Sequence, residues 1–264
     1  MLRWPFFWLP SHFGTSLDTK ACFGNKRPKR GKGKPEMVKE THKQLLQDIH
    51  QHHINIQNRE IYLHGNYSYD SEEPCVEYRM ATTFIKNLQL LDGINNNGII
   101  VHMHTGGGDW LDGMAIYNAV RFAKSPITFI TYGRATSMSG VILQAADLRI
   151  LTEDSEIMLH HGSIGVDGNS ISVKSAIETN EANCKRMLEL FALRAVRANY
   201  FKEKDYTTQQ IVKYINKKLE QKSDWYLSAK EAIHYGFADG ILGEGKYNNL
   251  DKLRYDKKTR IRKQ

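Results

Sequence analysis

The feature that most constrains this chain is a run of β-branched and aromatic residues that is followed directly by a run of small residues. The run 127–133 has the composition of a buried strand that ends at Gly133, and the stretch 141–146 has that of an apolar helix. Between them lies Ser137. A serine at such a turn projects its hydroxyl from the end of a sheet and lies at a helix N-terminus, where unpaired N–H groups favour negative charge. This geometry suits a nucleophilic serine, although a serine that only caps a helix is the commoner case.

The order of segments along the chain predicts an α/β fold with a largely parallel sheet. Strand-like segments alternate with segments whose apolar residues recur at helical spacing. The predicted strands are 59–64, 99–104, 127–133, 148–151 and 156–160. The predicted helices are about 37–57, 74–91, 113–120, 141–146, 173–199, 209–219 and 228–236, the last one opened by a capping box at Ser228.

The net charge of +8 is concentrated at the two ends of the chain. Residues 1–35 sum to +7 and residues 246–264 to +6, so the middle carries −5. We therefore divide the chain into a basic arm at 1–36, a folded domain at 37–245 and a basic C-terminal tail at 246–264. We expect both ends to be solvated and disordered. An acidic body disfavours a nucleic-acid-binding core, although either end could touch polyanions.

The cysteine and hydropathy patterns bear on cofactors and compartment. Cys22, Cys75 and Cys184 have no metal-ligand spacing, so we expect no metal, no disulfide framework and a reducing compartment. No apolar run approaches the roughly 20 residues of a membrane span. We expect a cytoplasmic protein without a cofactor. The acid-poor segment up to Pro35 would place it in an organelle instead, if that segment is a transit peptide.

Three predicted strand ends carry residues suited to catalysis. Thr105–Asp109 is a glycine-rich turn in which backbone N–H groups can approach a substrate, although an ordinary tight turn has the same composition. Ser137 follows the strand predicted at 127–133, and His160 ends the one predicted at 156–160; such ends gather at one edge of a parallel sheet. Imidazole is the natural base for a serine. His161 competes for this role, because only one of two successive strand residues can face Ser137.

Four segments in this order resemble the proteolytic subunit of the Clp protease, within the crotonase-like superfamily. Thr105–Tyr117 is similar to the family's Ser-Pro-Gly-Gly segment, and Gly133–Gly140 to its Gly-Gln-Ala-Ala-Ser-Met-Gly-Ala turn. Ile157–His160 is similar to its Met-Ile-His, and Asp224–Asp239 to its acid-bearing segment. The resemblance covers about residues 59–243. It implies a crotonase-like core of parallel strands with βα repeats and a protruding helix/strand handle at about 162–200.

The resemblance implies a metal-free serine endopeptidase that hydrolyses peptide bonds through a Ser-His-Asp triad and an acyl-enzyme. The matching positions are Ser137 as nucleophile, His160 as general base, Asp224 as the acid, and the N–H groups of Gly108 and Met138 as oxyanion donors. Glu220 is the reserve candidate for the acid. The order Ser, His, Asp along the chain is one of several that such triads adopt.

The resemblance also implies an assembly and leaves alternatives open. It implies a homo-oligomeric double ring, with heptameric rings, that acts on proteins or peptides and receives them from a hexameric ATP-driven unfoldase. The chain departs from the family at His161-Gly162, where the family has Gln-Pro, and at Ser223, where it has a basic residue. The family's axial-gate segment is not recognisable in residues 1–58. The alternatives are a phage-type maturation protease that works without an unfoldase in a host cytoplasm, an inactive ring subunit, and a crotonase-type acyl-CoA enzyme.

Overall fold

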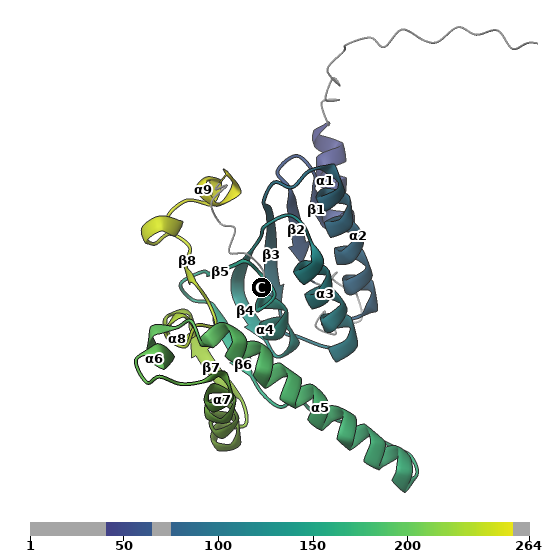
Figure 1. Ribbon diagram of the computed structural model, residues 1–264. Coiled ribbons are helices and arrows are strands. Elements are labelled where there is room, and N and C mark those ends of the chain that lie inside the picture. Colours follow the sequence, from purple (N-terminus) through teal and green to yellow (C-terminus); the bar gives the residue numbers. More distant parts are fainter. Residues whose placement is uncertain (1–40, 65–74, 256–264) are drawn as a thin grey trace, which may run out of the picture. The chain divides into compact units, whose positions relative to one another are not determined.

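The computed structural model describes residues 41–64 and 75–255, which belong to one compact unit of the chain (Figure 1). The predicted arm at 1–36, Pro74 and residues 256–264 lie outside the described residues. The strands are β1 (Ile54–Asn55), β2 (Glu60–Leu63), β3 (Ile99–Thr105), β4 (Ile127–Thr136), β5 (Leu148–Leu151), β6 (Glu156–Leu159), β7 (Trp225–Ser228) and β8 (Gly240–Ile241). The helices are α1 (His42–His52), α2 (Tyr78–Ile94), α3 (Trp110–Phe122), α4 (Met138–Leu143), α5 (Ser170–Ala195), α6 (Asn199–Lys202), α7 (Thr208–Lys222), α8 (Ala229–His234), the 3₁₀ turn η1 (Gly245–Tyr247) and α9 (Leu250–Tyr255).

The strands form a mostly parallel sheet, which confirms the predicted α/β class. The order along the main path is β1-β2-β3-β4-β5-β8, and β6 pairs with both β4 and β7. The pairs β1–β2 and β6–β7 are antiparallel, and the other pairs are parallel. Parallel neighbours need crossover connections, and the helices between the strands supply them.

One edge of β4 serves two different neighbours. Thr128–Thr131 pairs with β5, whereas Arg134–Thr136 pairs with β6. Gly133 lies between the two segments with φ +73°, a conformation that favours glycine. The prediction that the strand ends at Gly133 is therefore wrong, because the glycine redirects the strand instead of ending it. The continuation to Thr136 brings the residue after β4 beside the end of β6.

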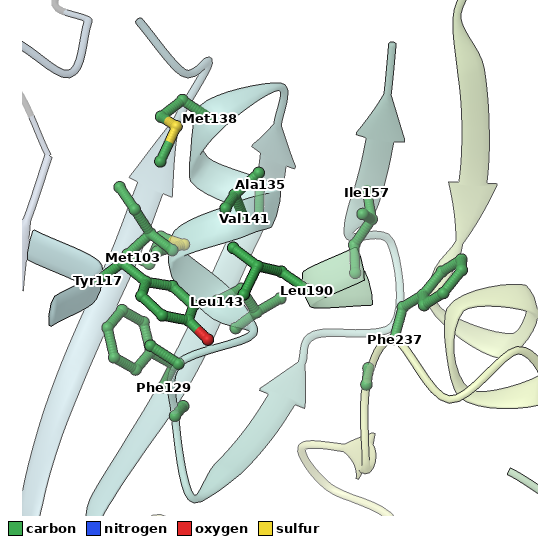
Figure 2. Packing of buried hydrophobic residues seen from close by; sticks show 14 of the residues in the cluster. Met103, Tyr117, Phe129, Ala135, Met138, Val141, Leu143, Ile157, Leu190 and Phe237 are labelled. Atoms are coloured by element: carbon green, nitrogen blue, oxygen red, sulfur yellow. The ribbon is translucent and has the colours of Figure 1, made fainter. Parts of the chain in front are cut away.

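The short helix α4 lies in the interior. All six of its residues are buried, and its Met138, Val141 and Leu143 lie among side chains of β3, β4, α3 and α5 (Figure 2). Burying an apolar side chain of this size contributes about 1.5–3 kcal/mol. The residue that precedes α4 is thus attached to one of the best-packed elements of the fold.

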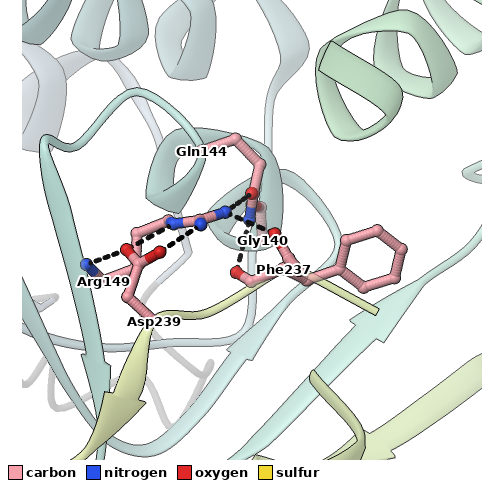
Figure 3. A network of polar contacts seen from close by, with 6 residues as sticks. Gly140, Gln144, Arg149, Phe237 and Asp239 are labelled. Atoms are coloured by element: carbon pink, nitrogen blue, oxygen red, sulfur yellow. Dashed lines mark hydrogen bonds and ion pairs between the residues drawn. The ribbon is translucent and has the colours of Figure 1, made fainter. Parts of the chain in front are cut away.

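A buried polar network joins the end of α4 to β5 and to the chain just before β8 (Figure 3). The guanidinium of Arg149 donates to both carboxylate oxygens of Asp239, at 2.9 and 2.6 Å, and to Gln144 Oε1 at 2.7 Å. It also donates to the carbonyl of Gly236 at 2.8 Å. Gln144 in turn donates to two carbonyls. We call this set the Arg149 network.

Several predicted helix bounds differ from the structure. The helix predicted at 37–57 is only α1 within the described residues, because His53 adopts a left-handed conformation and Ile54 enters β1. The helix predicted at 173–199 ends at Ala195, and α6 follows as a separate turn. Residues 160–169, between β6 and α5, contain no strand, so the handle region is an irregular segment followed by α5. The buried residues of α5 all lie between Met187 and Ala195, and the helix extends beyond them (Figure 1).

The first part of the predicted C-terminal tail is folded. Leu253 of α9 packs with Ile100, Ile130 and other residues of a second apolar cluster, and Tyr247 and Leu250 pack beside it. The spacing 247, 250, 253 is helical and apolar, and the basic charge of the segment obscured it. Residues 246–255 thus differ from the disorder expected of them.

Candidate active site

Ser137 lies in a strained turn between β4 and α4. Its φ of 56° and ψ of −125° are unusual for a residue with a side chain, and such a conformation costs about 1–3 kcal/mol. Its N–H donates to the carbonyl of Met158 at 2.8 Å, which fixes the turn to β6. The hydroxyl makes no capping hydrogen bond to α4. The helix-cap interpretation of this serine therefore fails, and its hydroxyl points elsewhere.

His160 is brought to Ser137 by the parallel pairing of β4 with β6. Thr136 pairs with Met158, so the residues that follow both strands leave the sheet at the same edge. The distance from Ser137 Oγ to His160 Nε2 is 2.7 Å, that of a good hydrogen bond. In the tautomer that leaves this nitrogen unprotonated, His160 is placed to accept the proton of the Ser137 hydroxyl.

Asp224 reaches His160 through the antiparallel pair β6–β7. Leu159 pairs with Trp225, so the same register places Asp224 opposite His160. The distance from Asp224 Oδ1 to His160 Nδ1 is 3.4 Å, which is long for a hydrogen bond. The side chain of Asp224 is 45% exposed and that of His160 is 23% exposed. The Asp224 carboxylate therefore lies beside Nδ1 of His160, but no short hydrogen bond holds it there.

The glycine-rich turn after β3 lies against the Ser137 turn. A β-carbon on Gly107 would come within 2.7 Å of Ser137 Cβ, so only glycine fits there. Val76 forms a bridge with Gly108 by accepting from Asp109 and donating to Gly107, which leaves the Gly108 N–H directed away from it. Within 41–64 and 75–255, neither the Gly108 nor the Met138 N–H has a hydrogen-bond partner. Both amides remain able to donate to a ligand.

A cleft of about 470 Å³ opens over these groups. It is lined by Gly108, Asp109, Trp110, Ser137, Met138, Val141, His160, His161, Gly162, Ser163, Asn180, Asn183, Cys184 and Met187. The lining mixes apolar side chains with a few polar groups, as ligand sites commonly do. Burial raises the pKa of the Cys184 thiol, which favours its neutral form in the cleft.

The two competing candidates have other partners. His161 Nε2 lies 3.0 Å from Asn216 Oδ1, and the amide of Asn216 donates to Glu220 at 2.7 Å. The structure therefore brings Ser137, His160 and Asp224 together, and it places Glu220 beside Asn216 instead. Nothing in the sequence had singled out Asn216, because its contacts depend on how α7 packs.

The described chain offers neither a membrane helix nor a metal cluster. No helix in it is both long and apolar enough to cross a bilayer. Among the same residues, no three or more His, Cys, Asp or Glu side chains are grouped so that they could hold a metal ion.

Comparison with known proteins decides the family. The family model described as Clp protease matches residues 71–245. The chain belongs to the Clp protease family. An ATP-dependent Clp protease proteolytic subunit from Deinococcus radiodurans is 30% identical over 177 residues, which cover 66% of this chain and 79% of that protein. One from Chlorella vulgaris is 28% identical over 155 residues, covering 58% of this chain and 70% of that protein.

A solved structure of the same family supports the fold. A mutant of the ClpP1 protein from Listeria monocytogenes matches with a TM-score of 0.56 and 20% identity, covering 75% of this chain and 96% of that one. The mixed sheet with helices is thus the fold of a Clp-type protease, as the sequence resemblance implied.

Proposed function

We propose that this Clp family member is a serine endopeptidase that hydrolyses peptide bonds through an acyl-enzyme. The observation that carries the proposal is the 2.7 Å contact between Ser137 Oγ and His160 Nε2 in the cleft. Ser137 attacks the carbonyl carbon while His160 takes the hydroxyl proton, and His160 then delivers that proton to the leaving amine nitrogen. Water, deprotonated by the same imidazole, releases the acid product and restores the serine.

The remaining groups take supporting roles in this proposal. Asp224 orients the imidazole and stabilises it once it is protonated, through Nδ1–H. The N–H groups of Gly108 and Met138 stabilise the oxyanion, and loss of one such donor typically costs about 3–4 kcal/mol. The strained Ser137 turn holds the oxygen in position before the substrate arrives.

The family supports a proposal about assembly as well. Two relatives carry the name ATP-dependent Clp protease proteolytic subunit. We assign the protease domain to 37–245, with residues 246–255 packed against it, and α5 to the handle of a homo-oligomeric double ring that receives its substrates from an ATP-driven unfoldase. We also propose a cytoplasmic location, because the spacing of the three cysteines does not suggest a disulfide framework.

The decisive test compares Ser137→Ala with the matched control Ser163→Ala, which removes a second serine hydroxyl from the same cleft. We expect Ser137→Ala to abolish cleavage of a short fluorogenic peptide and labelling by a fluorophosphonate, and Ser163→Ala to keep both. Size-exclusion chromatography checks that assembly is unchanged. Undiminished cleavage by pure Ser137→Ala protein would rule the mechanism out. An unlabelled wild-type serine would instead favour the crotonase-type or inactive-subunit alternatives.

A further inference from the structure

His160 lies where the regular structure ends. Strand β6 ends at Leu159, and the irregular segment that follows contains Gly162, Gly165 and Gly168. A β-carbon on Gly162 or Gly165 would meet no atom within 4 Å, so little packs against the chain there. The contact with Asp224 is long and partly exposed. The base therefore needs a further restraint to stay aimed at Ser137.

The next residue, His161, supplies contacts on both sides. Its ring nitrogen Nε2 lies 3.0 Å from Asn216 Oδ1 on α7. Its backbone carbonyl accepts a hydrogen bond from the Cys184 thiol of α5 at 2.9 Å. The first residue beyond the catalytic imidazole is thereby held between two helices.

The protons in this chain of contacts can be assigned. A carboxylate only accepts hydrogen bonds, so the Asn216 amide nitrogen donates to Glu220 Oε1 at 2.7 Å. The other end of that amide, Oδ1, can only accept, so His161 Nε2 carries a proton and donates to it. Glu220 orients Asn216, and Asn216 holds the ring of His161.

We propose that Asn216 is a positioning residue that holds His160 in place through His161. The inference rests on the proposed serine-protease function, and it gives Glu220 a role different from the triad acid. A shift of about 1 Å in the base can cost on the order of 100-fold in rate, so a restraint one residue away is enough to matter.

The experiment uses Asn216→Ala in the full-length protein, with Lys217→Ala as the matched control on the exposed surface of the same helix. We expect Asn216→Ala to lower kcat about 10- to 100-fold with KM nearly unchanged, because a misplaced base affects the transition state and not substrate binding. His161→Gln can still donate to Asn216 and is expected to keep most of the activity, whereas His161→Leu should match Asn216→Ala. Thermal unfolding checks that each variant is folded.

Hydrogen exchange gives a readout that does not require activity. In Asn216→Ala, the backbone amide of Leu159, which pairs with Trp225 at the end of β6, should exchange at least about tenfold faster, while β3 is unchanged. Unchanged exchange, or an unchanged kcat in an active protein, would overturn the positioning role. If wild-type protein neither cleaves peptide nor reacts with the fluorophosphonate, the proposed function fails, and the exchange measurement alone then decides whether Asn216 holds this loop.

Discussion

The Arg149 network and the Ser137–His160–Asp224 site both lie at strand ends, but they differ in burial and completeness. The side chain of Arg149 is 4% exposed, and each of its guanidinium nitrogens donates to an acceptor within the protein. The serine site is half-buried, its second contact is 3.4 Å long, and two adjacent amides have no partner among the described residues.

This difference separates polar groups that stabilise the fold from polar groups that are available for chemistry. In the Arg149 network, burial acts to raise the pKa of Asp239, but the charge and hydrogen bonds of Arg149 hold it below its usual value. Every strong interaction there is made inside the protein. At the Ser137–His160–Asp224 site, the Gly108 and Met138 N–H groups have no partner among the described residues, and Ser137 is held in a strained conformation. Backbone strain of this kind clusters at functional sites.

The largest expected effect comes from breaking the buried network. Asp239→Ala leaves the guanidinium of Arg149 buried without its carboxylate, and we expect the free energy of unfolding to fall by about 3 kcal/mol. Urea denaturation measures this change. Asp167→Ala, in the exposed loop before α5, should change stability by less than about 0.5 kcal/mol. The folded fraction of Asp239→Ala should still react with a fluorophosphonate at Ser137.

The same network predicts a pH dependence of stability. The folded-state pKa of Asp239 is lowered. The contribution of Asp239 to the free energy of unfolding is therefore fully present above its unfolded-state pKa of about 4. The contribution is lost as the pH falls through the lower folded-state value. Wild-type protein and Asp239→Asn should therefore approach each other in stability in acid. A difference that grew on acidification would contradict this assignment.

A smaller effect is expected from crowding the serine turn. A β-carbon in Gly107→Ala would come within 2.7 Å of both Ser137 Cβ and the Thr136 carbonyl. The backbone beside Ser137, the proposed nucleophile, must shift, and we expect kcat to fall about 100-fold. Gly165→Ala is the control, since a β-carbon there meets nothing within 4 Å. Equal peptidase activity of the two variants would show that the turn does not require its glycine.

Removing the charge of Asp224 beside the His160 imidazole should lower kcat less than it would in a triad with a short carboxylate–imidazole hydrogen bond. Asp224→Asn is expected to lower kcat by about 10-fold, because the contact is long and the carboxylate is 45% exposed. Steady-state cleavage of a fluorogenic peptide measures this. Glu220→Gln keeps an acceptor for Asn216 and should remain close to wild type. A larger loss of kcat in Glu220→Gln than in Asp224→Asn would contradict the assignment of Asp224 as the triad acid.

The smallest expected effect tests the backbone strain at Ser137. Glycine adopts the backbone conformation of residue 137 without the cost borne by a residue with a side chain, although it loses more entropy on folding. We expect Ser137→Gly to be about 1 kcal/mol more stable than Ser137→Ala, with both inactive. Chemical denaturation of the two variants compares them. Equal stabilities would mean that the turn stores no strain.

The sequence alone predicted the alternation of strands and helices and the strand ends that gather Ser137 and His160. These features depend on local composition and on the spacing of apolar residues along the chain, so they can be recognised without knowing the fold. The strand β7 was not recognised, although buried Trp225 and Leu227 alternate with exposed Tyr226 and Ser228. The continuation of β4 beyond Gly133 was missed because a glycine in a strand signals a turn as readily as a change of direction.

The separate roles of His160 and His161 could not be derived from their order in the chain. Alternation shows that the two side chains face different ways, but not which one faces the serine. That outcome depends on the register of β6 with β4, and on α7, which presents Asn216 to the other ring. Contacts between distant segments of this kind carry no local signature.

The shared edge of β4 limits how chains of this kind can change in length. Insertion or deletion of one residue between Thr128 and Thr136 would break the pairing with β5 or β6, and it would turn the later side chains of β4 to the opposite face. The loop at 161–169 has no such double attachment. Homologous chains should therefore gain and lose residues there, while the number of residues from the start of β4 to the serine stays constant.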